Sequence, residues 1–284
     1  ASLPSRRRSP WTGDSKVTPT LRPSSERMAI VSDEAATDFA KAVDICLPLG
    51  IRAYELRSLP GGRLPYCDEA GVQTVIDTTR ADGLTLLGVS PGFFKQKFDN
   101  PVRVKEMEEG LPLTFRLMER LGIRRIPLFT FPREGDTPLP PQPVLDFLGQ
   151  AYGRCKREGL EIVVENNAGH WADTGVHMAA IARSLDIKLT WDPANAAASG
   201  EQAVPDGYRA VREHTVHVHL KNWTPDRKNI VPLSDGVVNI AEQVRLLKAD
   251  AYPGYYCLEP HQWKEGPSAV RRDAATLMQY LQST

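Results

Sequence analysis

The chain of 284 residues is 41% hydrophobic and 25% charged, which excludes wholesale disorder and a fibrous repeat. Its 35 basic and 35 acidic side chains cancel, which argues against nucleic acid as its main partner. No apolar run reaches the roughly 18 residues that a membrane span needs, so no membrane contact is predicted.

The first 27 residues differ from the rest of the chain. They carry six basic and two acidic side chains, a net charge of +4, whereas the remainder carries −4. The segment is rich in Ser and Pro and has no apolar periodicity, so residues 1–27 are predicted to form an irregular arm without a catalytic role. No apolar stretch follows Arg6–Arg8, so a twin-arginine export signal is not indicated, and we expect a cytoplasmic protein.

From residue 28 onward, short apolar runs alternate with helical stretches. Several runs are nearly continuous in Val, Ile, Leu and Tyr, which is typical of strands buried on both faces of a parallel sheet. The predicted strands are Met28–Ser32, Ile51–Leu56, Leu84–Val89, Arg125–Phe131, Glu161–Val164, Ile187–Trp191, Thr215–Leu220 and Tyr255–Leu258.

Apolar residues at three- and four-residue steps predict helices between these strands. The predicted helices are Ala35–Leu49, Val102–Leu121, Val144–Glu158, Ala241–Ala249 and Ala269–Gln282. Five glycines stand between a helical stretch and the next strand, where a left-handed residue would close the helix: Gly50, Gly83, Gly122, Gly159 and Gly254. Eight such units predict an α/β fold, a single (β/α)8 TIM barrel over residues 28–284. A doubly wound open sheet is disfavoured because the first strand is not followed by GxGxxG.

Polar residues gather at the ends of the last four predicted strands. Glu165, Asp192, His219 and Glu259 each stand at or next to such an end. Because a barrel delivers the C-terminal ends of its strands to one face, these side chains are expected to converge. One such carboxylate alone is more often a helix cap or an ion-pair partner, but three carboxylates and an imidazole together would repel one another without a cation. We therefore predict one divalent metal ion, and this ligand set suits Mn²⁺, Mg²⁺, Co²⁺ or Zn²⁺.

The same strand ends carry a resemblance to a known family. They read Val-Glu-Asn, Asp-Pro-Ala-Asn, His-Val-His-Leu-Lys-Asn and Leu-Glu-Pro. In this order they resemble the xylose isomerase-like (β/α)8 barrels of the sugar phosphate isomerase/epimerase superfamily, and the resemblance covers the chain from residue 28 onward. It implies that Glu165, Asp192, His219 and Glu259 hold the metal ion. It also implies a small carbohydrate or keto-sugar substrate, and many members form homo-oligomers.

Three positions depart from the family pattern. Asn222 stands where the strand-seven motif usually ends in Asp, and Asn195 stands where ketose 3-epimerases carry His. Pro225 replaces an Arg of the same enzymes. These departures argue against a simple free-ketose epimerase. The segment 165–169 more closely resembles a branch that includes dehydratases and keto-sugar enzymes.

The predicted chemistry is proton abstraction next to a carbonyl. A metal ion that bridges the carbonyl and a neighbouring hydroxyl would stabilise the enediolate. Glu165 and Glu259 are the predicted catalytic acid–base residues, because a partly desolvated carboxylate can take a carbon-bound proton. Proton return gives a sugar isomerase or epimerase. Loss of a β-hydroxyl instead gives a lyase or dehydratase of a keto-sugar or keto-inositol, or cleavage of a 3-keto-glycoside, and the sequence leaves both open.

Further residues near these strand ends are predicted to bind substrate. They are His217, Lys221, Asn195, His170, Trp223 and His261, with Trp171 and Trp263 in the same loops. Two of them have a structural alternative: His217 as a core histidine and Lys221 as an ion-pair partner of Asp192 or Glu259. Glu55 and Arg57 end the second strand and share one face, so they could reach the substrate from the opposite wall of the site. A structural ion pair inside the barrel is the preferred interpretation.

Two other functions fit the sequence less well. A metal-dependent nuclease shares this barrel but needs further His and carboxylate ligands and a basic face, and no histidine precedes His170. A non-catalytic sugar-binding barrel would follow if the four ligands did not converge. The four cysteines are widely separated and lack CxxC spacing, so neither a disulfide scaffold nor a Cys-ligated zinc site is expected.

Overall fold

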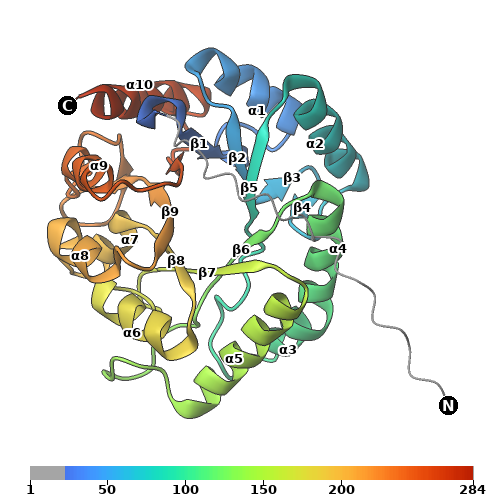
Figure 1. Cartoon of the computed structure of the whole chain (residues 1–284), viewed down its shortest axis with the longest axis vertical. Coiled ribbons are helices and arrows are strands. Elements are labelled where there is room, and N and C mark those ends of the chain that lie inside the picture. The colour runs from blue at the N-terminus through green and yellow to red at the C-terminus, as the bar shows by residue number, and fades with distance from the viewer. Residues whose placement is uncertain (1–22, 284) are drawn as a thin grey trace.

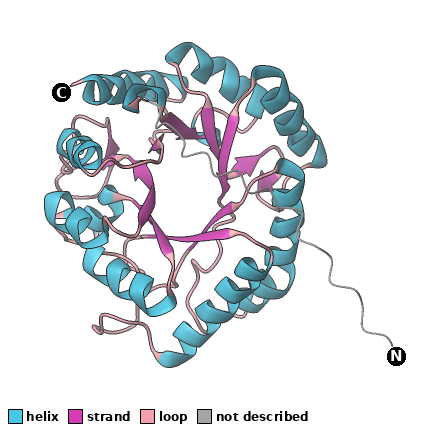
Figure 2. Cartoon of the chain, viewed as in Figure 1, coloured by secondary structure: helices cyan, strands magenta, loops and turns pink. Residues whose placement is uncertain are grey.

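The computed structural model describes residues 23–283, and their eight parallel strands form one sheet curled into a barrel (Figures 1 and 2). The strands are β1 (Met28–Val31), β2 (Ala53–Leu56), β5 (Thr85–Val89), β6 (Arg125–Leu128), β7 (Glu161–Glu165), β8 (Lys188–Trp191), β9 (Thr215–Leu220) and β12 (Tyr256–Leu258). Every strand predicted from the sequence is present, and the predicted (β/α)8 barrel is confirmed.

The barrel closes between β5 and β6. The hydrogen-bonded order is β5-β2-β1-β12-β9-β8-β7-β6, so these two strands are the ends of the sheet. They lie side by side, because a Cβ atom at Gly88 of β5 would be 3.3 Å from the carbonyl oxygen of Arg125 on β6. Close packing at this glycine therefore completes the ring.

Helices surround the strands (Figure 2). They are α1 (Phe39–Cys46), α2 (Glu69–Asp82), α3 (Val102–Lys105), α4 (Leu111–Leu121), α5 (Gln142–Arg157), α6 (Gly175–Leu185), α7 (Pro193–Ala198), α8 (Tyr208–Val211), α9 (Ile240–Ala249) and α10 (Pro267–Gln282). Two small hairpins extend from strand ends: β3 (Ser58–Leu59) with β4 (Gly62–Arg63), and β10 (Asn222–Trp223) with β11 (Ile230–Val231).

Two of the predicted helices are interrupted. The helix expected over Ala35–Leu49 is α-helical only in α1, with 3₁₀ turns on either side. The helix expected over Val102–Leu121 is divided by a π-helical turn, Glu106–Gly110. Pro112 has no N–H to donate to the carbonyl of Glu108, so the regular bonding pattern cannot run through this point.

Four of the five predicted helix-closing glycines have positive φ: Gly50, Gly83, Gly122 and Gly159. The prediction for Gly254 is wrong. The left-handed residue after α9 is Ala251, with φ of 50°. A side chain at position 254 is excluded by packing, because a Cβ atom there would lie 2.2 Å from the hydroxyl of Tyr252.

Strand alternation separates the packed core from the polar interior of the barrel. On β9, Val218 and Leu220 belong to the main apolar core, whereas His217 and His219 point to the other face. On β12, Leu258 belongs to that core as well, whereas Cys257 joins Ala29, Val31 and Ala53 in a second, smaller cluster. Small side chains at this level leave room for larger polar ones.

The N-terminal boundary differs in detail from the predicted arm. Residues 1–22 lie outside the described residues. Ser24–Glu26 form a 3₁₀ turn, and Arg27 is buried, with Nη1 donating to the carbonyls of Tyr252 at 2.5 Å and Gly254 at 2.7 Å. These last residues of the predicted arm pack on the barrel.

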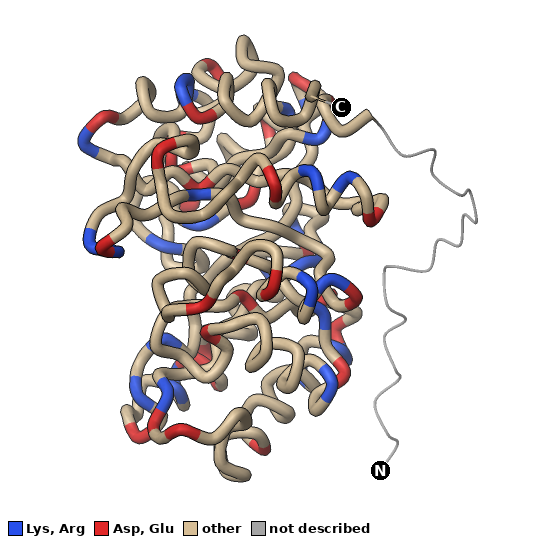
Figure 3. Tube along the Cα trace, turned by 90° about the vertical axis from the view of Figure 1, so that its left-hand side faces the viewer, with Lys and Arg blue, Asp and Glu red and all other residues tan. Residues whose placement is uncertain are grey.

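Acidic and basic residues are interspersed on the side of the molecule that Figure 3 shows. Among the described residues, no helix combines the length and the apolar character that a membrane span requires.

Candidate metal centre and active-site cavity

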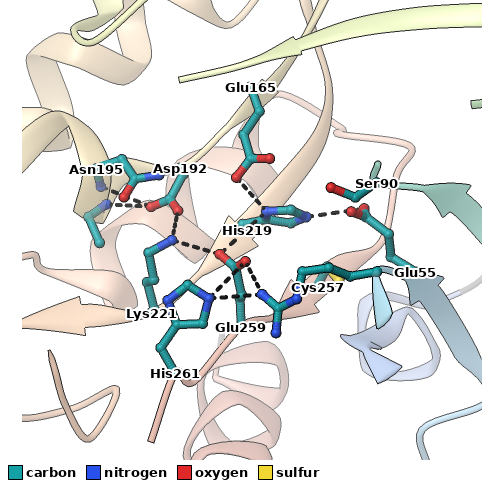
Figure 4. Close-up of polar contacts among 12 residues, drawn as sticks. Glu55, Ser90, Glu165, Asp192, Asn195, His219, Lys221, Cys257, Glu259 and His261 are labelled. Carbon is teal, nitrogen blue, oxygen red and sulfur yellow. Dashed lines mark hydrogen bonds and ion pairs between the residues drawn. The ribbon is translucent and has the colours of Figure 1, made fainter. Parts of the chain in front are cut away.

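The four predicted ligands meet at the C-terminal ends of the strands. Glu165 ends β7, Asp192 follows β8, His219 lies near the end of β9 and Glu259 follows β12. One ligand atom from each lies within 4.8 Å of the others, and all four residues are buried (Figure 4). The structure therefore brings together the residues that the strand-end pattern indicated.

Asp192 is both a helix cap and a candidate ligand. Its Oδ1 accepts hydrogen bonds from the backbone N–H groups of Ala194 at 2.9 Å and Asn195 at 3.0 Å, which caps α7. Asn166 fixes the backbone of Asp192 by accepting from its N–H and donating to its carbonyl, both at 2.8 Å. The other carboxylate oxygen of Asp192, Oδ2, makes no capping bond and faces the candidate metal site. The cap and the ligand, which appear as alternatives in the sequence, use different oxygens.

His219 is held between carboxylates on both sides of its ring (Figure 4). Nδ1 lies 3.1 Å from Oε1 of Glu165 and 3.6 Å from Oε2 of Glu259, while Nε2 lies 3.1 Å from Oε2 of Glu55. Burial opposes the charged ring, but the three carboxylates outweigh it and raise the pKa of His219 well above its usual value. A metal ligand of this type commonly donates its second N–H to a carboxylate. Glu55 is placed for that role.

Glu55 does not pair with Arg57, contrary to the expected ion pair. Its Oε2 also lies 3.0 Å from Nε2 of His217, and a ligand atom of Cys257 lies within the same 4.8 Å group. Burial raises the pKa of Glu55, but the two imidazoles outweigh it and leave that pKa below its usual value. His217 is fully buried, and burial lowers its pKa.

Arg57 joins the loops after the first two strands to Glu259. Its guanidinium contacts Asp33 at 3.0 Å, Glu34 at 2.5 Å and Glu259 at 2.9 Å. Burial disfavours its charge, but these carboxylates outweigh that effect and raise the pKa of Arg57. Glu55 lies on β2, whereas Arg57 follows the end of that strand, and the two side chains contact different partners.

Lys221 lies between two of the candidate ligands (Figure 4). Its Nζ is 2.5 Å from Oδ2 of Asp192 and 2.6 Å from Oε2 of Glu259. Burial disfavours the ammonium, but these two carboxylates outweigh it and raise the pKa of Lys221. Burial raises the pKa of Glu259, but the positive charges of Lys221, His261 and His219 outweigh this effect and hold that pKa well below its usual value.

A cavity of about 350 Å³ opens beside this cluster. Its lining includes carboxylates, three cations, two hydroxyls and two aromatic rings: Asp33, Glu55, Arg57, Ser58, Arg63, Ser90, Lys95, Phe129, Glu165, Glu259, His261 and Trp263. Arg63, Ser90, Lys95 and Phe129 are not among the site residues predicted from the sequence. All four lie at strand ends or in loops of the first half of the chain, where no repeating pattern marks them.

Only one of the six predicted substrate-binding residues is part of this lining. His261 lines the cavity, with Nε2 3.1 Å from Oε1 of Glu259. The other five lie outside the lining: His217, Lys221, Asn195, His170 and Trp223. Trp263 lines the cavity and is 63% exposed.

The contacts of two of these residues are structural. The side-chain amide of Asn195 donates to the carbonyl of Asn166 at 2.8 Å, which ties α7 to the end of β7. His170 contacts the Asn167 amide at 2.9 Å, and burial lowers its pKa. A substrate-binding role for either remains a prediction.

Asn222, which departs from the family pattern, makes contacts that only an amide can make. Its Nδ2 donates to the carbonyls of Leu233 at 3.0 Å and Val238 at 2.9 Å. Its Oδ1 accepts from the N–H groups of Trp223 and Val238, each at 3.0 Å. An ionised Asp could not donate to the two carbonyls. The departure therefore stabilises the loop that follows β10.

The donor set fits a divalent ion. Oδ2 of Asp192 is buried and accepts no hydrogen bond, although it forms an ion pair with Lys221. Nδ1 of His219 faces the carboxylates of the other candidate ligands. Three oxygen donors and one nitrogen donor suit Mn²⁺, Mg²⁺, Co²⁺ and Zn²⁺ alike. A divalent ion and the Lys221 ammonium would compete for Asp192 and Glu259.

Comparison with known proteins identifies the family. The family model of the xylose isomerase-like TIM barrel matches residues 43–280. The chain belongs to this family. No curated protein sequence matches the chain significantly.

Several solved structures share the barrel at low sequence identity. L-ribulose 3-epimerase superposes with a TM-score of 0.71 at 15% identity, covering 90% of this chain and 94% of its own. The probable 3-DHS dehydratase AsbF from Bacillus anthracis gives 0.66 at 16%, covering 88% and 98%. The IolI protein with a bound zinc atom gives 0.68 at 13%, covering 90% and 98%. Proteins with a similar fold thus include an epimerase, a probable dehydratase and a zinc-binding protein.

Proposed function

We propose that the protein is a divalent-metal-dependent sugar isomerase or epimerase that removes a proton next to a carbonyl. The observation that carries this proposal is the convergence of Glu165, Asp192, His219 and Glu259 within 4.8 Å beside a cavity of about 350 Å³. That volume suits a small carbohydrate. The family includes epimerases of this fold.

The four residues would hold one metal ion. Such an ion, when bound, polarises a carbonyl and stabilises an enediolate. His219 would face it with Nδ1, because Nε2 is engaged by Glu55. Arg57 neutralises the outer oxygen of Glu259 and so fixes that carboxylate at the mouth of the site.

Glu165 is the better placed base of the two glutamates. It contacts His219 through Oε1 and lines the cavity. Glu259 is engaged by Arg57, Lys221 and His261, which favours its ionised form. Figure 4 shows Glu165 and Glu259 on opposite sides of His219. Glu165 would take the proton, and His261, positioned by Glu259, would return one from the other side.

A lyase or dehydratase is the second candidate. His261 lines the cavity and lies 3.1 Å from Glu259, so the site has a proton donor in addition to the two glutamates. Such a donor could protonate a departing β-hydroxyl. The family also includes a probable dehydratase of this fold.

Proton exchange in D₂O tests the proposal directly. Metal-loaded protein is incubated with a panel of ketoses, keto-sugars and keto-inositols, and deuterium incorporation and product identity are followed by NMR. We expect incorporation with at least one sugar, lost by about 10²-fold or more in Glu165→Gln, and unchanged in the exposed control Glu158→Gln. Metal analysis accompanies each sample. Retained exchange in Glu165→Gln, or exchange that persists after removal of the metal, would overturn the proposal.

A further inference from the structure

The wall of the cavity formed by Arg63 and Lys95 carries positive charge that the protein does not neutralise. Of the three cations in the lining, Arg57 is paired with three carboxylates. None of the carboxylates among residues 23–283 lies within ion-pair distance of Arg63 or Lys95. These two cations therefore differ from Arg57 in having no carboxylate in direct contact, although Glu165 and Glu259 act on both from a longer distance.

Arg63 is held in place by the loop that follows β5. Its Nε donates to the carbonyl of Ser90 and its Nη2 to the Ser90 hydroxyl, both at 3.2 Å. Gly92 has φ of +76°, and a Cβ atom there would lie 2.6 Å from the guanidinium carbon. Ser90 and Gly92 thus orient a planar cation without cancelling its charge, as in sites that recognise an anion.

Lys95 comes from the same loop and points to the same cavity. Its Nζ lies 3.9 Å from the centre of the Phe129 ring, which also lines the cavity. Burial lowers its pKa, and the charge of Glu165 offsets this only in part. An ammonium held over an aromatic face and lacking a carboxylate keeps its donors free.

The remaining carboxylates of the cavity have other uses. Asp33 is bound to Arg57, and Glu55 is bound to His217 and His219. Under the proposed function, Glu165 and Glu259 are directed to a divalent ion. A loaded site would then present two partly buried cations with no protein anion, an arrangement that is costly unless a ligand supplies the charge.

We propose that Arg63 and Lys95 bind an anionic group of the substrate, a carboxylate or a phosphate. This inference rests on the proposed function and narrows its substrate class to keto-sugar acids or keto-sugar phosphates. The hydroxyls of Ser58 and Ser90 line the same cavity and can donate further hydrogen bonds to such a group. The reacting carbons would then lie between this anion site and Glu165.

Anion binding by metal-free protein tests this directly. Protein treated with a chelator is titrated with inorganic phosphate, followed by ³¹P NMR relaxation, and with [¹³C]acetate, followed by ¹³C relaxation. We expect saturable binding of one anion, which distinguishes phosphate from carboxylate as the source of the charge. Lys95→Met and Arg63→Met should each weaken binding by about tenfold or more, the loss of a charge-assisted contact. Lys95→Arg should restore it.

Lys97→Met is the matched control, because Lys97 lies on the same loop, is exposed and loses the same charge. It should bind the anion as tightly as wild type. Circular dichroism establishes that each variant is folded. Absence of saturable binding to either anion, or equal binding by Lys95→Met and Lys97→Met, would overturn the anion site.

The same samples separate this inference from the proposed function. Deuterium exchange with neutral sugars only, together with no anion binding, would refute the anion site and leave the proposed function supported. Anion binding that depends on Arg63 and Lys95 in a protein that binds no metal would support the site and refute the proposed function.

Discussion

Replacing Glu55 with Gln removes a buried charge behind the proposed metal ligand His219. In the structure, Oε2 of Glu55 lies 3.1 Å from Nε2 of His219 and 3.0 Å from Nε2 of His217. Gln preserves the shape and one acceptor oxygen but not the charge. We expect the fold to be retained and the affinity for the metal ion to fall.

The size of the effect follows from the contact that is changed. A hydrogen bond to a charged group is worth roughly 1.5–3 kcal/mol and a neutral one roughly 0.5–1.5 kcal/mol, so the bond to His219 loses about 1.4 kcal/mol. That difference corresponds to about tenfold in affinity, at the lower end of the 10- to 100-fold typical of such partners of metal ligands.

Isothermal titration with Zn²⁺ and Mn²⁺ measures this change, and thermal unfolding of the metal-free variant reports on the fold. Glu201→Gln is the control, because that partly buried carboxylate accepts a hydrogen bond from the N–H of Gly175 at 2.7 Å and does not line the cavity. A folded Glu55→Gln protein whose metal affinity stays within about twofold of wild type would refute the role assigned to Glu55.

Three further predictions concern Lys221, Asn222 and the thiols. Lys221→Gln should lower the unfolding temperature of the metal-free protein, because Asp192 and Glu259 lose their positively charged partner. It should also strengthen metal binding, because the ammonium that competes with the metal ion for these carboxylates is removed. Weaker metal binding by this variant would contradict the reasoning. Asn222→Asp should reduce the free energy of unfolding in urea by about 2–4 kcal/mol, since two buried carbonyls lose their donor; an unchanged value would show that the loop does not depend on the amide. A thiol reagent at pH 8 should modify only Cys67 in the native protein and all four cysteines after unfolding. Burial raises the pKa of Cys46 and of Cys155 to about 12, and it raises the pKa of Cys257 well above its usual value. Rapid reaction of a second thiol in the native protein would contradict the packing described.

The convergence of the four candidate ligands could be predicted because its signal is local and repeated. Each ligand stands at the end of an apolar run, and the barrel sends all such ends to one face. His217, His219 and Lys221 share one side of their strand by simple alternation, which places them inside the barrel. Helix α2 is not among the predicted helices, because it buries few apolar side chains and gives only a weak periodic signal.

The partners of these side chains could not be predicted in the same way. Glu55 near the end of β2 and Arg57 just after it are two residues apart, yet one contacts His219 across the barrel and the other contacts Glu259. Such pairing depends on strand register and on side-chain rotamers, which alternation does not specify. Arg63 and Lys95 lie on a hairpin and in a loop, where backbone shape alone decides what they face.

The succession of strands, the barrel and the set of four candidate ligands can be read from the sequence alone, because strand burial and periodicity depend on residues that are close together in the chain. Which charges pair with each other, and which lack a partner at ion-pair distance, depends on the three-dimensional arrangement. Coulombic and hydrogen-bonding interactions act over a few ångströms in space, between residues as distant in the chain as Glu55 and His219. The overall neutrality of the chain therefore conceals two cavity cations, Arg63 and Lys95, without a protein anion, and it is their position that indicates an anionic substrate.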